Sequence, residues 1–392
     1  MIERDMKKTA LLLAGQYPVV VITGPRQSGK TTLCRTTFPD KAYVNLEMPD
    51  IRQYAMDDPK SFLTDYAEGA ILDEIQRAPE LLSYIQGMVD EDDRAGRFIL
   101  TGSQQFELMH SVSQTLAGRV GLLKLLPLSL AELQRHGFDA SPDTHLFTGS
   151  YPRIYDKNLN PSQAMGDYFE TYVQRDIRQL VQLKNVAVFE TFVRLCAGRT
   201  GQLLNLSALG ADAGVSHATA REWINVLEAS YILFRLRPWH ANISKRLVKS
   251  PKLYFYDTGL ASYLLDMEST KHMRSHPLRG ALFENMVIVE ALKQRLNRGK
   301  RSNLSFYRDS AGHEVDLLLT SGTDLYPIEI KSGTTVNRDY FKGLIFFSKL
   351  KNLSITRGAV IYAGDDAQTR GSWQVCPVKA MGNLLLSLNE EQ

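Results

Sequence analysis

The stretch Gly24-Pro25-Arg26-Gln27-Ser28-Gly29-Lys30-Thr31 decides the fold, because it matches the P-loop pattern G-x-x-x-x-G-K-T. An apolar run at 18–23 precedes it, and no Gly or Pro follows for several positions. This order of strand, glycine loop and helix is the context in which the pattern binds phosphate. The loop turns its N–H groups inward, and the helix N-terminus adds partial positive charge. The expected nucleotide-binding residues are Gly24, Pro25, Arg26, Gln27, Ser28, Gly29, Lys30, Thr31 and Thr32.

Two residues of this loop have specific expected roles toward ATP. Lys30 would reach the β- and γ-phosphates, and Thr31 would hold Mg²⁺. A glycine turn with a chance lysine is the alternative interpretation. A second motif at a suitable distance argues against that alternative.

The second motif lies at 69–75, where a short apolar run ends in Asp73 and Glu74. In this Walker B pattern, Asp73 would hold Mg²⁺ through water, and Glu74 would be the general base that polarises the attacking water. Another apolar run, at 97–101, leads to Ser103. Ser103 could contact the γ-phosphate or the water as a sensor residue, and an ordinary turn serine is the alternative.

The first 135 residues alternate between strand-like and helical stretches. We expect strands at 18–23, 42–46, 69–72, 97–101 and 120–126. Such alternation predicts an α/β fold, with a parallel sheet covered by helices on both faces and ligands at the carboxyl ends of the strands. Gly24, Asp73 and Ser103 all fall at such ends.

Arg119 follows a glycine just before the fifth expected strand. In a ring-forming ATPase, an arginine near this position could reach the γ-phosphate of the neighbouring subunit. Its guanidinium would neutralise charge on the transferred group. A surface arginine is the alternative interpretation of Arg119. We expect the protein to form a homo-oligomer.

The motifs together resemble a family of prokaryotic AAA+ ATPases whose members carry a C-terminal domain of unknown function. The motifs that carry the resemblance are the P-loop, Leu72-Asp73-Glu74-Ile75-Gln76, Leu100-Thr101-Gly102-Ser103, Leu116-Ala117-Gly118-Arg119, Gly149-Ser150-Tyr151-Pro152 and Asp257-Thr258-Gly259-Leu260. The resemblance covers almost the whole chain. It implies the strand order of the additional-strand P-loop ATPases, and ATP with Mg²⁺ as ligands. It leaves the biological task open.

The rest of the chain divides by composition and periodicity. A polar segment at 138–150 suggests a boundary, and apolar spacing predicts a long helix over 161–183. The expected parts are an ATPase domain at 1–135, a helical lid or linker at 136–185, a winged-helix domain at 186–250 and a nuclease-like domain at 251–392.

The segment 206–227 reads as helix, glycine-containing turn and helix, with Ser207 and Ser216 as N-caps, and an alternating strand at 231–237 follows. Helix–turn–helix plus a strand hairpin predicts a winged helix, whose second helix would present Arg221 to DNA. Residues 184–249 carry nine Lys or Arg and four Asp or Glu, a local excess that favours phosphate contact. A winged helix used only for protein packing is the alternative.

The C-terminal third carries a second constellation of charged residues. Glu284 lies near the start of an expected amphipathic helix, Asp316 on a strand, and Glu329 and Lys331 on one face of the next strand. This is the D…E-x-K arrangement of PD-(D/E)xK nucleases, in which carboxylates hold Mg²⁺ and the lysine orients water against a phosphodiester. A nuclease-like fold that serves only as a contact module is the alternative.

Composition limits the remaining choices. The formal net charge of +3 is too small to indicate nucleic acid by itself, so any basic surface must be local. The three cysteines fit neither a disulfide framework nor a zinc site, and we find no signal peptide or long apolar run. We therefore expect a cytoplasmic ATPase without membrane insertion that acts on DNA. A remodelling ATPase with a protein partner and an ATP-gated endonuclease are the alternatives.

Overall fold

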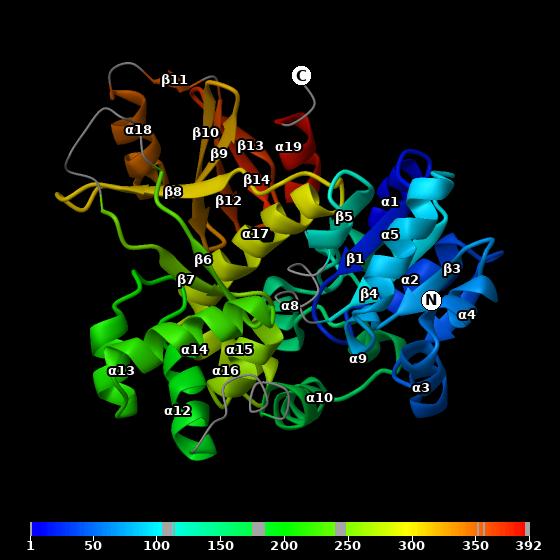
Figure 1. The fold of residues 1–392 in the computed structure, drawn as a ribbon. Coiled ribbons are helices and arrows are strands. Elements are labelled where there is room, and N and C mark those ends of the chain that lie inside the picture. Colours follow the sequence, from blue (N-terminus) through cyan, green and yellow to red (C-terminus); the bar gives the residue numbers. More distant parts are fainter. Residues whose placement is uncertain are drawn as a thin grey trace. The chain divides into compact units, whose positions relative to one another are not determined.

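The computed structural model describes residues 2–103, 112, 114–174, 185–239, 248–350, 353–355 and 357–388 (Figure 1). The chain forms two compact units. The first unit contains residues 1–128 with two short later segments, 229–231 and 296–301, and the second contains the rest. The three parts that we expected beyond residue 135 therefore lie almost entirely within the second unit.

The first unit is built on a sheet of five parallel strands in the order β2-β3-β4-β1-β5. The strands are β1 (Val19–Thr23), β2 (Ala42–Asn45), β3 (Ala70–Asp73), β4 (Phe98–Gly102) and β5 (Val120–Lys124). Strand β4 lies between β1, which leads into the P-loop, and β3, which ends in Asp73. The predicted additional-strand order is thus confirmed, and all five strands lie within two residues of their expected positions.

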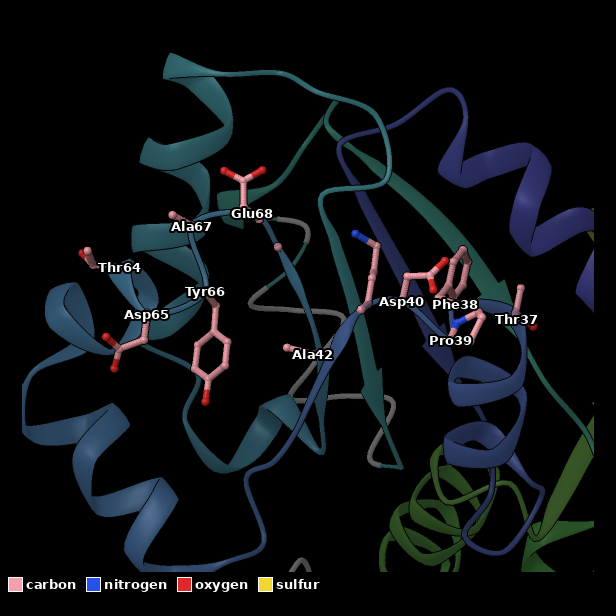
Figure 2. A pocket seen from close by; sticks show the side chains of 12 residues that line it. Thr37, Phe38, Pro39, Asp40, Ala42, Thr64, Asp65, Tyr66, Ala67 and Glu68 are labelled. Carbon is pink, nitrogen blue, oxygen red and sulfur yellow. The ribbon is translucent and has the colours of Figure 1, made fainter.

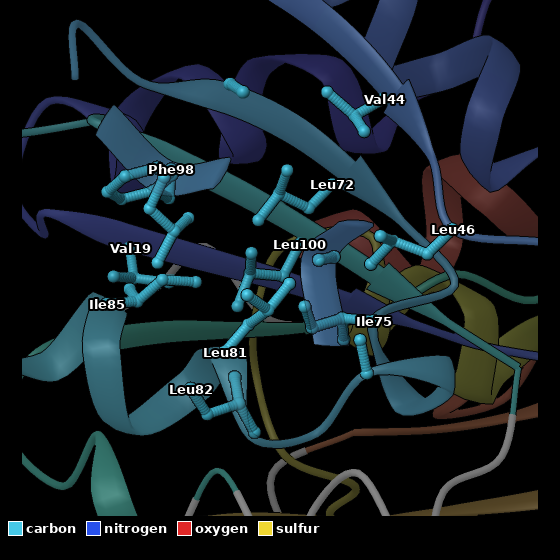
Figure 3. Packing of buried hydrophobic residues seen from close by; sticks show 14 of the residues in the cluster. Val19, Val44, Leu46, Leu72, Ile75, Leu81, Leu82, Ile85, Phe98 and Leu100 are labelled. Carbon is cyan, nitrogen blue, oxygen red and sulfur yellow. The ribbon is translucent and has the colours of Figure 1, made fainter. Parts of the chain in front are cut away.

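Helices cover both faces of this sheet, as predicted. They are α1 (Met6–Ala14), α2 (Lys30–Thr37), α3 (Pro49–Asp57), α4 (Pro59–Thr64), the 3₁₀ turn η1 (Ile75–Arg77) and α5 (Leu81–Glu91). Because side chains alternate along a strand, Val20 and Ile22 face α1 and α2, whereas Val19 and Val21 face α3, α4 and α5. Figure 3 shows the second of these layers, in which Leu72 and Leu100 pack beside Val19.

The second unit contains a seven-stranded mixed sheet in the order β13-β14-β12-β10-β9-β8, with β11 also paired to β10. The strands are β8 (Leu304–Arg308), β9 (Glu314–Ser321), β10 (Asp324–Lys331), β11 (Ser354–Ile355), β12 (Gly358–Tyr362), β13 (Gln368–Arg370) and β14 (Trp373–Pro377). Its helices from residue 258 onward are α15 (Thr258–Leu264), α16 (Thr270–Ser275), α17 (Arg279–Leu296), η3 (Arg338–Phe341), α18 (Lys342–Ser348), η4 (Val378–Ala380) and α19 (Met381–Ser387).

Helix α17 differs from its predicted character. We expected an amphipathic helix, but every residue from 285 to 293 is buried. Polar side chains such as Asn285, Glu290 and Lys293 are among them, and each has a hydrogen-bond partner inside the protein. The polar positions therefore do not mark a solvent face, since internal partners compensate for their burial.

The earlier part of the second unit is helical. It contains α7 (Leu130–Arg135), α8 (Pro142–Thr148), α9 (Pro152–Asp156), α10 (Pro161–Tyr168), the π-helical η2 (Phe169–Gln174), α12 (Val186–Ala197), α13 (Leu206–Ala213) and α14 (His217–Ala229). Strands β6 (Leu233–Leu236) and β7 (Lys252–Phe255) form an antiparallel pair after α14. The predicted helix–turn–helix followed by a strand is present, while its interpretation as a winged helix stays a prediction.

Two local predictions in this region need correction. The helix expected over 161–183 changes from α to π geometry at Phe169, and residues 175–184 lie outside the described residues. The N-cap of α13 is Asn205, whose side chain accepts from the N–H of Ala208, and not Ser207. Ser216 does cap α14, because its hydroxyl accepts from the N–H of Thr219.

Candidate functional site

The P-loop adopts a conformation that only glycine permits at two positions. Gly24 has φ of 150°, and a Cβ atom there would lie 2.1 Å from the carbonyl oxygen of Leu125. Gly29 has φ of 92° and forms the N-cap of α2. The first turn of α2, which is described throughout, carries no acidic side chain. Its N–H groups are therefore suited to receive a phosphate.

Lys30 is buried and folds back over its own loop. Its Nζ donates to the carbonyl oxygens of Gly24 at 3.0 Å and Pro25 at 2.9 Å. Burial lowers the pKa of Lys30, and the nearby carboxylates of Glu74 and Asp73 oppose that shift. Phosphate oxygens would offer this ammonium a stronger, charged acceptor than the two carbonyl groups.

Asp73, at the end of β3, is held by three hydroxyl groups. Its Oδ2 accepts from Thr31 Oγ1 at 2.8 Å and from the hydroxyl of Tyr43 at 2.7 Å. Its Oδ1 accepts from Thr101, at the end of β4. The structure thus brings together the two residues that we expected to hold Mg²⁺, Thr31 and Asp73. A hydroxyl and a carboxylate side by side are the oxygen ligands that Mg²⁺ prefers, so the residues fit the ion.

Glu74 adopts a left-handed backbone conformation, with φ of 58°. Its Oε2 accepts from Ser103 Oγ at 2.9 Å and also from the amide of Gln76. Ser103 therefore lies at the predicted edge of the sheet and contacts the predicted general base. A strained backbone and two donors fix the carboxylate in one orientation.

Sequence reasoning gave no role to several residues of this site. Thr101 could have been found, because it occupies the carboxyl end of the strand beside β3. Tyr43 lies two residues before the end of β2, and no motif distinguishes it. Gln76 reaches Glu74 only because η1 turns the chain back after the strand.

Arg119 lies at the other edge of the same sheet. Its carbonyl oxygen accepts from the N–H of Val19 at 3.3 Å, at the start of β1. At about 3.3 Å per strand residue, that places it on the order of 15 Å from the P-loop edge. Its guanidinium forms a two-pronged ion pair with Asp90 of α5. Arg119 therefore cannot act on the nucleotide of its own subunit, and its role toward a neighbour stays a prediction.

The four residues of the predicted nuclease-like site do come together in the second unit. Lys331 Nζ contacts Asp316 at 3.1 Å and also contacts Glu329, while the N–H of Ile330 donates to Asp316 at 2.8 Å. Glu284 pairs with Lys252 of β7 at 2.8 Å, and the same ammonium contacts Glu314. We call these six side chains the carboxylate–lysine cluster.

Lysines occupy the positions between the carboxylates of this cluster. Burial and the charge of Asp316 raise the pKa of Glu329 to about 9. Burial alone would lower the pKa of Lys331, but Asp316 and Glu329 raise it. Across the described ranges, no group of three His, Cys, Asp or Glu side chains is arranged to hold a metal ion. In the predicted second metal site, lysine ammonium groups therefore contact the carboxyl groups that we expected to bind a metal ion.

Comparison with known proteins supports the interpretation of the first unit as a P-loop ATPase domain. A family model described as an AAA domain matches residues 16–134, and models of two domains of unknown function, DUF8612 and DUF4143, match residues 140–271 and 279–381. The uncharacterized proteins Rv2008c of Mycobacterium tuberculosis and Mb2031c of Mycobacterium bovis are each 31% identical over 354 residues, 89% of this chain and 77% of theirs. This chain belongs to their family. It carries the P-loop of an AAA-type ATPase.

Solved structures resemble this AAA-type ATPase at a lower level. The Walker-type ATPase PABY2304 of Pyrococcus abyssi is 14% identical, with a TM-score of 0.46, over 68% of this chain and 96% of that one. AMPPCP-bound DnaA from Aquifex aeolicus is 16% identical, with a TM-score of 0.30, over 57% of this chain and 85% of that one.

Several cations in and around the helix–turn–helix of the AAA-type ATPase have acidic partners. Arg221 and His217 are exposed on α14, 3.5 Å apart. However, three of the nine cations of this segment form ion pairs, which are Arg194 with Asp266, Arg199 with Asp212, and Arg235 with Glu228. Three more, Lys184, Lys245 and Arg246, lie outside the described residues. Among the described residues, Arg194, Arg199 and Arg235 are therefore less available to phosphate than unpaired cations would be.

A cavity of about 720 Å³ lies at the amino edge of the five-stranded sheet, between the loops that precede β2 and β3. Figure 2 shows Asp40 on one side and Asp65, Tyr66 and Glu68 on the other. None of the predicted nucleotide-binding residues lines it. The cavity is separate from the P-loop, and sequence reasoning gave no signal for it.

In the parts of the chain that the structure describes, no helix has both the length and the apolar character needed to cross a bilayer.

Proposed function

We propose that this AAA-type ATPase hydrolyses ATP with Glu74 as the general base. The main support is that the adjacent carboxylates of Asp73 and Glu74 have different hydrogen-bond partners. Hydroxyl groups hold Asp73 beside Thr31, whereas Ser103 and Gln76 hold Glu74. One carboxylate is thus oriented toward the P-loop threonine and the other is held separately by a serine and an amide. These different surroundings suit Asp73 to metal binding and Glu74 to activation of the attacking water.

Thr31 and Asp73 would hold Mg²⁺, which neutralises charge on the transferred phosphoryl group. Lys30 would leave the carbonyl oxygens of Gly24 and Pro25 and bind the phosphates. Ser103, as the sensor residue, would donate to Glu74 or to the attacking water. The water oxygen bonds to the γ-phosphorus, the bond to ADP breaks, and Glu74 takes the proton.

We also propose that hydrolysis serves an action on DNA, through α13 and α14 acting as a winged helix. The support is the exposed Arg221 and His217 on the second helix of the motif, the position that enters the major groove in DNA-binding versions. The ion pairs of Arg194, Arg199 and Arg235 favour a second candidate, a remodelling ATPase with a protein partner, because neutralised cations contribute little to phosphate binding.

The nuclease alternative requires the carboxylate–lysine cluster to open. Each of its lysines contacts two carboxylates, so a metal would have to displace a paired ammonium. That displacement is costly for buried charges. We therefore expect the cluster to serve as a structural element of a nuclease-like domain.

The test measures ATP turnover by the full chain with Mg²⁺, alone and with single-stranded, duplex and branched DNA. We expect turnover that DNA increases, and a Glu74→Gln variant that binds ATP but does not turn it over. Absence of turnover in the wild type would refute the ATPase proposal. Turnover that is the same with each DNA as without DNA would favour the protein partner. Mg²⁺-dependent nicking that Asp316→Ala abolishes would instead establish the endonuclease.

A further inference from the structure

Two arginines of the first unit share one carboxylate beside the P-loop. Arg26 lies within the loop, and its guanidinium is 3.7 Å from Glu47. Arg77, at the end of η1, is 3.8 Å from the same carboxylate oxygen. The group therefore carries one more positive than negative charge.

The position of Glu47 places this group on the Walker B side of the loop. Glu47 comes two residues after the end of β2, where Asn45 pairs in register with Asp73. The N–H of Leu46 donates to the carbonyl oxygen of Asp73 at 3.1 Å, so the chain at this point lies directly beside the Walker B aspartate. Arg77 is anchored from the same side, since its N–H donates to the carbonyl oxygen of Glu74. The main chain that carries Glu47 and Arg77 thus adjoins the end of β3, which carries Asp73 and Glu74.

Arg26 also lies near the P-loop lysine. Burial is the largest cause of the lowered pKa of Lys30, and the positive charge of Arg26 contributes to it. Two cations of one loop, at positions 26 and 30, are suited to bind the same polyanion. ATP would satisfy both at once, because its terminal phosphate bears most of the charge that the transition state redistributes.

The contacts with Glu47 are loose. Charge-assisted N–H···O bonds measure about 2.7–2.9 Å, whereas both arginines are almost 1 Å further from the carboxylate oxygen. All three side chains are partly exposed, with 28% for Arg26, 40% for Arg77 and 44% for Glu47. Water can therefore compensate for the partner that leaves, and an exchange of partners is easy.

We propose that Arg26 is a catalytic arginine that acts within its own subunit, and that Glu47 holds it until the terminal phosphate of ATP takes over. This inference rests on the proposed ATPase function. As water bonds to the γ-phosphorus and the bond to ADP breaks, the guanidinium of Arg26 stabilises the charge on the transferred oxygens. Arg77 keeps its contact with Glu47, so the carboxylate stays in place when Arg26 moves to the phosphate.

The test compares steady-state hydrolysis and nucleotide binding for wild type, Arg26→Ala, Arg26→Lys and Glu47→Gln. For Arg26→Ala we expect kcat to fall about 10²- to 10³-fold, and for Arg26→Lys an intermediate loss, because lysine keeps the charge but not the two-pronged geometry. The affinity for ADP should change less than about threefold, since ADP lacks the terminal phosphate. Glu47→Gln should lower the KM for ATP, because it removes the competing acceptor.

Arg94→Ala is the matched control, because Arg94 is another partly exposed arginine of the first unit that pairs with acidic side chains, Glu68 and Asp92, and it lies outside the P-loop. It should keep wild-type kcat. If the wild type hydrolyses ATP and Arg26→Ala hydrolyses it at the same rate, the proposed role of Arg26 is overturned and the ATPase proposal stands. Recovery of activity when Arg26→Ala and Lys30→Ala proteins are mixed would also overturn it, since it would place the arginine in a neighbouring subunit. A wild type without turnover would instead refute the ATPase function itself.

Discussion

The hydroxyl group of Tyr231 lies 3.0 Å from that of Thr23, the last residue before the P-loop glycine Gly24. Tyr231 is buried and has φ of 57°, an uncommon conformation for an aromatic residue. A side chain 208 positions later in the sequence thus fixes the end of β1. Tyr231 comes two residues after Ala229, the last residue of α14, and residues 229–231 belong to the first unit, as the P-loop does.

Tyr231→Phe removes this hydrogen bond and keeps the ring. We expect the variant to lose about 0.5–1.5 kcal/mol of stability, the usual net value of one hydrogen bond. It should also raise the KM for ATP severalfold, because the strand end that carries the P-loop is held less firmly. Thermal unfolding and steady-state kinetics measure the two effects.

Tyr168→Phe is the matched control for this prediction. It removes a hydroxyl–hydroxyl bond of 2.8 Å, to Tyr151, in the second unit. A similar loss of stability with unchanged kinetics is expected. Equal kinetic effects in the two variants would show that Tyr231 has no special relation to the P-loop.

Arg119→Ala tests the predicted action on a neighbouring subunit. If the arginine acts in trans, hydrolysis should fall by about 10³-fold or more while ATP affinity stays close to that of the wild type. Mixing with Lys30→Ala protein should restore part of the activity, since each variant supplies what the other lacks. Asp90→Ala breaks the same ion pair but keeps the arginine, so it should stay active. No restoration in a verified mixed oligomer would end the trans hypothesis.

Arg221→Glu tests the proposed DNA contact of α14. The affinity for DNA should fall, and wild-type affinity should decrease steeply with salt, as expected when phosphate contacts release counterions. Filter binding or fluorescence anisotropy over a salt series measures both. Lys60→Glu makes the same change of charge on exposed α4 and should leave the affinity unchanged. Wild-type protein that fails to bind DNA at low salt would remove this hypothesis.

Glu329 predicts a pH dependence of stability in the second unit. Its pKa is raised from 4.5 to about 9 by burial and by Asp316, so the folded protein keeps a proton that the unfolded chain releases. The stabilising contribution is therefore complete below the unfolded value and is lost as pH rises toward the folded value. Unfolding temperatures should fall from about pH 5 to 9 in the wild type, and Glu329→Gln should flatten that profile. An unchanged slope in the variant would assign the dependence to other groups.

The sequence predicted the five-stranded sheet well because its signals are local. Apolar runs of strand length, each followed by a glycine or a carboxylate, place Gly24, Asp73 and Ser103 at one edge without any long-range information. Side-chain partners were harder to predict. Tyr231 contacts Thr23 from 208 positions later in the sequence. Lys252 of β7 contacts the carboxylate–lysine cluster although it precedes the D…E-x-K residues by more than sixty positions. No spacing rule identifies such partners, since tertiary packing alone brings them together.

The first unit is completed only late in the chain, because residues 296–301 belong to it. The hydroxyl of Thr9 in α1 donates to the carbonyl oxygen of Asn297 at 2.7 Å, and Gly299 approaches both Thr9 and Leu123. When residues 1–128 have emerged from the ribosome, the ATPase unit therefore still lacks the residues 296–301 that pack against α1. During synthesis, residues 129–295 are made before the segment 296–301 that completes the packing around the P-loop sheet. Chaperones that bind exposed apolar surface would meet the protein in that interval.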